Sequence, residues 1–213
     1  MEERRRGPAE MPNFGTPSTP RQAASIVLLR RGGKHSQRAL EVLMLKRSEE
    51  AKFMPGVWVF PGGSLDEADG TQEAGLRACA VRELAEEAGI ELPPEEELVP
   101  FTRWITPELI ATRFDAWFFL ALAPAHTPPK PDGMETTEAR WFEPAAALAA
   151  QDAGELVLSF PTRTQLEWLA EYRTSHEALA AYRQRPLESI LPKVVEDGPE
   201  PRVVLPGDPD YPA

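Results

Sequence analysis

The stretch RELAEEAGI, residues 82–90, decides the fold of this chain. It places three glutamates, Glu83, Glu86 and Glu87, on one short segment that ends at a glycine. On a helix of about 3.6 residues per turn, these three side chains fall within an arc of about 100°. Like charges at such spacing repel by roughly 0.2–0.5 kcal/mol per pair. A solvated acidic face is the ordinary explanation of this pattern, so the surrounding sequence has to decide between that face and a binding site.

The residues around this stretch predict a long helix. From Thr71 to Ala88 apolar residues recur at three- and four-residue spacing, and Gly89 is the expected terminator. Just upstream, FPGGSLDEAD, residues 60–69, supplies a glycine turn whose backbone can approach the acidic patch closely. Carboxylates, a main-chain carbonyl and substrate phosphate oxygens are the ligands that Mg²⁺ prefers. The two stretches together therefore favour a divalent cation that holds a phosphate.

The rest of the chain alternates strands and helices. Two apolar runs within 23–46 flank the polar GGKHSQ and predict a hairpin. Further strands are expected at 56–63, 98–106, 113–123 and 139–144, and 113–123 is apolar enough to be buried on both faces. One or two amphipathic helices follow Pro161. This order predicts an α+β fold, an α/β/α sandwich with a mixed curved sheet between helices.

Length and composition predict one globular domain. The chain has 213 residues, of which 42% are hydrophobic and 27% charged. Its 23 prolines gather towards both ends. We expect a disordered N-terminal segment at 1–20, one domain at 21–190 that includes the C-terminal helices, and a Pro-rich extended tail at 191–213. The C-terminal helices are expected to pack on the domain, with a self-association surface as the alternative.

Several classes of protein are disfavoured by the sequence. The single cysteine, Cys79, excludes an intramolecular disulfide and a cysteine zinc cluster, and it reads as a small buried residue. No run of about 18 apolar residues exists, and no apolar run follows the first arginines, so we expect no membrane partner, no secretory signal and a cytoplasmic location. A net charge of −11 argues against nucleic acid as a partner.

The acidic stretch and the glycine turn resemble the signature of the Nudix hydrolases. That box reads G, five residues, E, seven residues, then R-E-U-x-E-E-x-G-U, where U is a bulky apolar residue. Residues 82–90 match its second half at every specified place, and Gly63 matches its start. The next specified glutamate is replaced by Asp69, and DGTQEAGL, residues 69–76, reads as an insertion of about five residues. Glu67 or Glu73 is the alternative source of that carboxylate.

The resemblance extends from about residue 23 to residue 150. VLMLKRSEEAKFMPGVWVFPGGSLDEAD, TRFDAWFFLA and TEARWFEP are similar to the branch that includes the peroxisomal coenzyme A diphosphatases and their bacterial relatives. This implies a Nudix fold with extra C-terminal helices. It also implies hydrolysis of a nucleoside diphosphate linked to another moiety, by attack of water on phosphorus.

The resemblance further implies a cofactor, Mg²⁺ or Mn²⁺, and roles for individual residues. The expected metal ligands are Glu83 and Glu87, then Glu86, with help from the Gly63 carbonyl. Arg82 is expected to orient a box carboxylate. The general base comes from the box or from a later glutamate, and the later candidates are Glu135 and Glu138. Arg47 is expected to reach a substrate phosphate, although a solvated arginine is the plainer explanation.

The substrate prediction is a small-molecule nucleotide diphosphate. Coenzyme A or acyl-coenzyme A derivatives are favoured over ADP-ribose, NADH or a sugar nucleotide. The alternative is a catalytically weak Nudix-like module that binds a nucleotide without cleaving it, because the first half of the box is altered. We expect a monomer or a homodimer.

Overall fold

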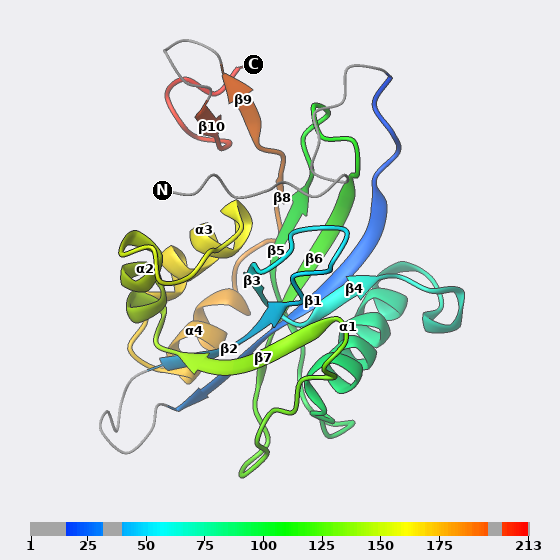
Figure 1. The fold of residues 1–213 in the computed structure, drawn as a ribbon, viewed down its shortest axis with the longest axis vertical. Coiled ribbons are helices and arrows are strands. Elements are labelled where there is room, and N and C mark those ends of the chain that lie inside the picture. Colours follow the sequence, from blue (N-terminus) through cyan, green and yellow to red (C-terminus); the bar gives the residue numbers. More distant parts are fainter. Residues whose placement is uncertain (1–15, 32–39, 196–201, 213) are drawn as a thin grey trace.

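The computed structural model describes residues 16–31, 40–195 and 202–212 (Figure 1). Its strands are β1 (Arg21–Arg31), β2 (Leu40–Arg47), β3 (Trp58–Val59), β4 (Gly62–Ser64), β5 (Val99–Ile105), β6 (Phe114–Leu122), β7 (Thr136–Phe142), β8 (Ser189–Ile190), β9 (Lys193–Val195) and β10 (Arg202–Val204). Its helices are α1 (Gln72–Ala88), α2 (Pro144–Asp152), α3 (Phe160–Leu169) and α4 (Ser175–Tyr182), with a short 3₁₀ turn at Glu67–Asp69.

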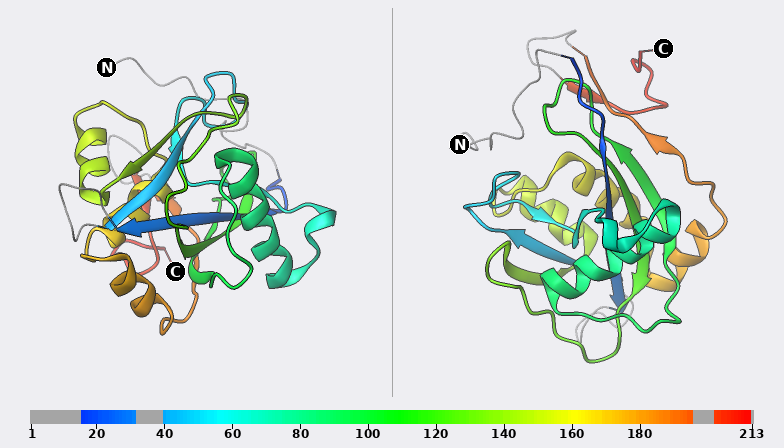
Figure 2. Two further views of the ribbon diagram at one scale, coloured as in Figure 1. Left: turned by 90° about the horizontal axis from the view of Figure 1, so that it is seen from below. Right: turned by 90° about the vertical axis from the view of Figure 1, so that its right-hand side faces the viewer.

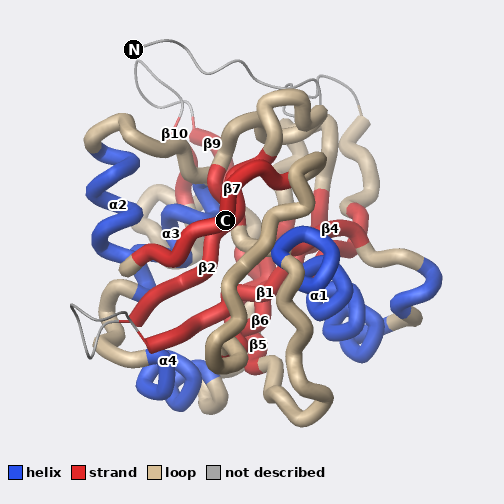
Figure 3. The backbone as a smooth tube through the Cα atoms, turned by 60° about the horizontal axis from the view of Figure 1, so that its bottom comes forward, coloured by secondary structure: helices blue, strands red, loops and turns tan. Residues whose placement is uncertain are grey.

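The sheet lies between two helical layers, with α1 on one face and α2, α3 and α4 on the other (Figures 1 and 3). Strand β1 shows why, because alternate side chains point to opposite faces. Ile26 and Leu28 pack in the cluster that includes α1, whereas Val27 and Leu29 pack in the cluster that includes the other three helices. The predicted α/β/α sandwich is therefore confirmed.

The strands β1–β8 form one mixed sheet with β1 near its centre. The order along the sheet is β3-β2-β1-β6-β5-β8, while β4 pairs with β1 and β7 pairs with β2. The predicted hairpin is the antiparallel pair β1 and β2, and its turn, 32–37, lies outside the described residues. β6 runs parallel to β1, and Phe119 and Leu120 are buried on opposite faces, as the apolar run predicted.

Helix α1 ends where the sequence predicts and begins one residue later than predicted. Thr71 is its N-cap, and Gly89 ends it in a left-handed conformation at φ 62°, which glycine adopts without strain. The buried face of α1 consists of Gly75, Leu76, Cys79, Ala80, Leu84, Glu87 and Ala88. One member of this apolar face, Glu87, is a carboxylate, and its burial requires an explanation.

The C-terminal helices pack on the domain. Leu166, Leu169 and Leu179 are buried in the core cluster of the second face, so these apolar positions do not form a self-association surface. Trp58, Phe60 and Trp104, aromatic residues of the predicted strands, are also buried. Helix α2 was not predicted. No helix in the described part of the chain is long and apolar enough to cross a membrane.

Near the start of the described chain a hydrogen bond contacts the domain, and near its end two short strands pair with each other. Arg113 donates to the Ser18 carbonyl at 2.8 Å, just before β1. Within the predicted tail, β9 and β10 form a separate antiparallel pair. Figures 1 and 2 show this pair at one end of the molecule, away from α1. The domain boundaries at 20 and 190 stay predictions.

Candidate active site

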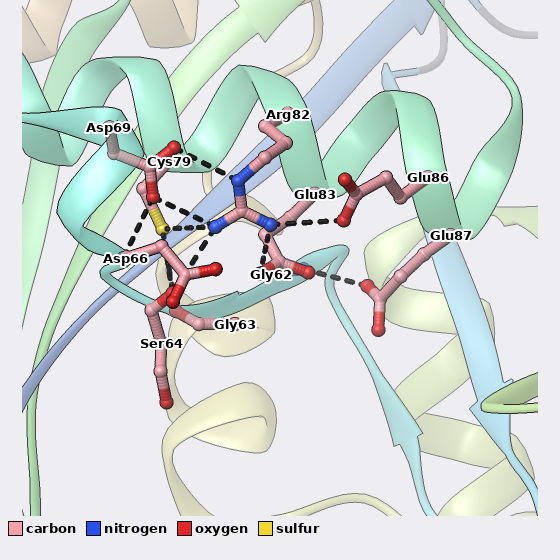
Figure 4. Close-up of polar contacts among 10 residues, drawn as sticks. All are labelled: Gly62, Gly63, Ser64, Asp66, Asp69, Cys79, Arg82, Glu83, Glu86 and Glu87. Atoms are coloured by element: carbon pink, nitrogen blue, oxygen red, sulfur yellow. Dashed lines mark hydrogen bonds and ion pairs between the residues drawn. The ribbon is translucent and has the colours of Figure 1, made fainter.

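Arg82, on α1, lies at the centre of a carboxylate cluster (Figure 4). Its Nη1 atom donates to Glu83 Oε1 at 2.8 Å and to Glu86 Oε2 at 2.9 Å. Its Nε and Nη2 atoms bind the two Asp69 oxygens at 2.9 and 2.8 Å. A bidentate arginine–carboxylate pair fixes both position and orientation. Arg82 therefore joins the box helix to the preceding loop, while its predicted role at the site stays a prediction.

Asp69 supplies the carboxylate at the altered position of the box. Its side chain is 5% exposed, and the hydrogen bond from Arg82 lowers its pKa to about 2. The insertion does not prevent this contact, because the loop folds back over α1. A Cβ atom on Gly75 would lie 2.7 Å from the Gly70 carbonyl carbon, so glycine permits this close approach. Glu73, one alternative, instead pairs with Arg77.

Asp69→Asn is expected to destabilise the fold at neutral pH by about 2 kcal/mol, because a charge-assisted pair loses its charge. The pKa of Asp69 is lowered on folding, so its stabilisation is present above about pH 4 and is lost as the pH falls towards 2. The difference between variant and wild type should shrink over that range in denaturant titrations. Asp152→Asn, which removes an exposed ion pair with Arg163, is the control and should cost less than about 1 kcal/mol. Equal stability of Asp69→Asn and wild type at pH 7 would contradict this role.

Glu83 lies directly against the glycine turn. A Cβ atom on Gly63 would lie 2.3 Å from Glu83 Oε1, so only glycine leaves room for this carboxylate. Burial raises the pKa of Glu83, although the hydrogen bond from Arg82 opposes this. The Gly63 carbonyl faces Cys79 Sγ at 3.7 Å. Burial raises the pKa of that thiol to about 12, so Cys79 is the inert buried residue that the sequence predicts.

Glu87 is the buried carboxylate of the cluster, with 4% of its surface exposed. Its Oε2 atom accepts the Gly62 N–H at 2.9 Å. Burial is the main cause that raises the pKa of Glu87 to about 7; the negative charges of Glu83 and Glu135 act in the same direction, and the Gly62 N–H and the charge of Arg47 oppose them. In the described part of the chain no lysine or arginine forms an ion pair with this carboxylate. The cluster thus carries negative charge that its own cations do not balance.

The two later candidates for the general base, Glu135 and Glu138, lie in different places: Glu135 in the loop before β7 and Glu138 within β7. Glu135 acts on the pKa of both Glu83 and Glu87, so its charge lies close to the cluster. Glu138 pairs with Arg140, and its Oε1 atom lies 3.6 Å from Lys46 Nζ. Arg47 donates from Nε to the Phe53 carbonyl at 3.0 Å, and its charge acts on Glu87.

The donor set fits a divalent cation that prefers oxygen. A buried carboxylate with a raised pKa and two neighbouring carboxylates suits Mg²⁺ or Mn²⁺. The described residues contain no group of three or more His, Cys, Asp or Glu side chains that is already arranged to hold a metal ion. Arg82 forms ion pairs with both Glu83 and Glu86.

A family model described as the NUDIX domain matches residues 19–160. This chain belongs to the Nudix family. The matched span includes the glycine turn, the box helix and the loop that carries Glu135. The predicted assignment to the Nudix hydrolases, and with it the prediction of an enzyme, is confirmed at the level of the family.

Individual Nudix proteins resemble the chain at low identity. A Caenorhabditis elegans protein named "Putative nudix hydrolase 7" is 30% identical over 187 residues, 72% of this chain and 61% of that protein. The chain therefore spans less than two thirds of that relative. The Xenopus laevis protein "Acyl-coenzyme A diphosphatase NUDT19" is 23% identical over 81% of this chain and 71% of its own length. The crystal structure of a Nudix hydrolase from Alicyclobacillus acidocaldarius superposes on this chain with a TM-score of 0.70 and 24% sequence identity. The match covers 79% of this chain and 99% of that protein's chain, which shows the shared fold.

Proposed function

We propose that this Nudix protein hydrolyses the pyrophosphate bond of a nucleoside diphosphate linked to another moiety, with Mg²⁺ or Mn²⁺ as cofactor. The observation that carries the proposal is the buried Glu87 carboxylate, which lies beside Glu83 and within the field of Glu135 at a glycine turn. Structural acidic faces are solvated, whereas this carboxylate is buried at an energetic cost. A bound cation offsets this cost of burying the carboxylate, because the cation stabilises its charged form.

Each residue of the cluster has a role in this proposal. Glu83, Glu86 and Glu87 would hold the cation, which would neutralise charge at the phosphate oxygens and lower the pKa of the attacking water. Glu135 accepts a proton from that water as the general base. Arg82 keeps the helix and the loop in register through Asp69. Arg47 binds a substrate phosphate, because the contact of its Nε atom with Phe53 fixes a positive charge beside the cluster.

Coenzyme A or an acyl-coenzyme A derivative is the favoured substrate. Two observations support it: the name of the Xenopus laevis relative, and the sequence resemblance outside the box to the coenzyme A diphosphatase branch. Coenzyme A, ADP-ribose and NADH present the same pyrophosphate to the cluster, so the cluster itself does not discriminate among them. The cytoplasmic location and a monomeric or homodimeric state stay predictions.

A substrate panel tests the proposal. Coenzyme A, acetyl-coenzyme A, ADP-ribose and NADH are each incubated with the protein and Mg²⁺ or Mn²⁺, and the products are separated by chromatography. We expect the two coenzyme A compounds to yield adenosine 3′,5′-bisphosphate and to be cleaved with the highest kcat/KM. Cleavage of ADP-ribose with intact coenzyme A would contradict the substrate assignment. Cleavage of none of the four, together with tight binding of one, would favour the binding module.

A further inference from the structure

We propose that Asp132 is a positioning residue that holds Glu135 at the carboxylate cluster. This inference rests on the proposed function, in which Glu135 is the general base. The sequence analysis did not single out Asp132, although PDG, residues 131–133, is a turn signal directly before the candidate base.

The carboxylate of Asp132 organises the loop that carries Glu135. Its Oδ1 atom accepts the backbone N–H groups of Met134, Glu135 and Thr136 at 3.0, 3.1 and 2.8 Å. Its Oδ2 atom lies 3.2 Å from the Glu135 nitrogen. Gly133 permits the turn with φ 78°, and its N–H donates to the Thr136 carbonyl at 2.9 Å. A single side chain thus fixes the backbone on both sides of Glu135.

The same loop is attached to the two elements that border the cluster. The buried Thr136 hydroxyl donates to the Glu87 carbonyl at 2.9 Å, at the end of α1. One residue further along α1, the Ala88 carbonyl accepts the Lys130 N–H at 2.7 Å. On the other side, the Glu135 carbonyl accepts the Ser48 N–H at 2.8 Å, just after β2. The loop is therefore held against the same helix turn that carries Glu87.

These contacts explain how an exposed residue reaches the cluster. Glu135 is exposed and no described hydrogen bond holds its carboxylate, whereas its carbonyl accepts the Ser48 N–H and the next residue, Thr136, donates to the Glu87 carbonyl. Its backbone must then supply the position that its side chain does not. Asp132 supplies the acceptor for that backbone, and without it the N–H groups of Met134, Glu135 and Thr136 lose this partner.

A double-mutant cycle with coenzyme A or ADP-ribose, whichever the wild type cleaves, tests this role. Asp132→Ala is expected to lower kcat about 30- to 100-fold with KM within about threefold, since a misplaced catalytic group costs up to about 100-fold. Glu135→Gln is expected to lower kcat by about 10²- to 10⁴-fold. Asp132→Ala added to Glu135→Gln should then cost less than about threefold, because there is no base left to misplace. Asp132→Asn keeps the Oδ1 acceptor and should restore most of the activity.

Two results would overturn the role of Asp132: an unchanged kcat in Asp132→Ala, or the same loss in the Glu135→Gln background as in wild type. Asp208→Ala is the matched control, since Asp208 Oδ2 accepts the Leu205 N–H at 2.8 Å in a turn of the C-terminal segment.

Amide hydrogen exchange is the readout that needs no turnover. The N–H groups of Glu135 and Thr136 should exchange at least about tenfold faster in Asp132→Ala, and unchanged exchange would overturn the proposal even if no substrate is cleaved. Lack of all hydrolysis with the expected exchange would instead contradict only the proposed function.

Discussion

Glu87→Gln is expected to lower kcat by at least about 10³-fold, because a lost cation ligand removes several kcal/mol of charge stabilisation. The fold should survive, since a glutamine oxygen can accept the Gly62 N–H and glutamine has a similar helix propensity. The free energy of unfolding at pH 8 should even rise, because the burial that raises the pKa of Glu87 opposes its charged form. Glu86→Gln should also lose turnover.

The pH dependence of Mn²⁺ binding is a second test of the role of Glu87 as a cation ligand. Because burial raises the pKa of Glu87 to about 7, this carboxyl is largely protonated below pH 7 and must lose its proton to bind a cation. Wild-type affinity, measured by calorimetry, should therefore increase as the pH rises to about 7 and change little above it. Glu87→Gln should bind weakly at every pH.

Glu73→Gln is the control for Glu87→Gln, since Glu73 lies on the first turn of the same helix and pairs with Arg77. It should retain wild-type turnover and Mn²⁺ affinity. If Glu86→Gln and Glu87→Gln both turn over like the wild type, the metal assignment is wrong.

Gly63→Ala is expected to lower kcat by about 10²-fold or more without unfolding the protein. The added Cβ atom would lie 2.3 Å from Glu83 Oε1, and the carboxylate can move away because it is the end of a flexible side chain. The displaced atoms are those that the proposal assigns to the cation, and a displacement of about 1 Å can cost about 10²-fold. Steady-state kinetics and thermal melts measure the two effects.

Gly62→Ala provides the contrast. Its Cβ atom would lie 2.6 Å from the Ala24 carbonyl oxygen and 2.0 Å from Ser25 Oγ, both in β1. Because backbone of a central strand cannot yield easily, this variant should be destabilised by about 1–3 kcal/mol or more. Equal activity of Gly63→Ala and wild type would show that the position of Glu83 is not required.

The parts of the fold that the sequence predicted have strong local signals. Helix α1 combines apolar periodicity with a terminating glycine, and its observed start differs from the prediction by one residue. Helix α2 was missed because Pro144–Asp152 is mostly alanine, which gives little amphipathic contrast. The short strands β4 and β8 depend on their partners β1 and β5, and such pairing has no local signal in three or two residues.

The site could be predicted where the box residues share one helix, since helix geometry brings Glu83, Glu86 and Glu87 together. The choice between Glu135 and Glu138 depends on the loop and on strand register. Glu138 lies opposite Lys46 in the β2–β7 ladder, whereas Glu135 precedes the strand in a turn attached to α1. Asp69 was the preferred match for its position, and only the folded loop shows how it reaches Arg82 across the insertion.

The parallel pairing of β1 with β6 also sets the order in which this protein can fold. β1 begins the described domain and β6 follows the whole box helix, so a growing chain carries α1 before it has the neighbour that completes the centre of the sheet. Until Phe119 arrives, the apolar face of α1 lacks part of its cover. Contacts between such distant segments slow folding, and the exposed intermediate invites aggregation. The pairing that completes the centre of the sheet thus makes the period of synthesis the one in which this protein is most prone to aggregate.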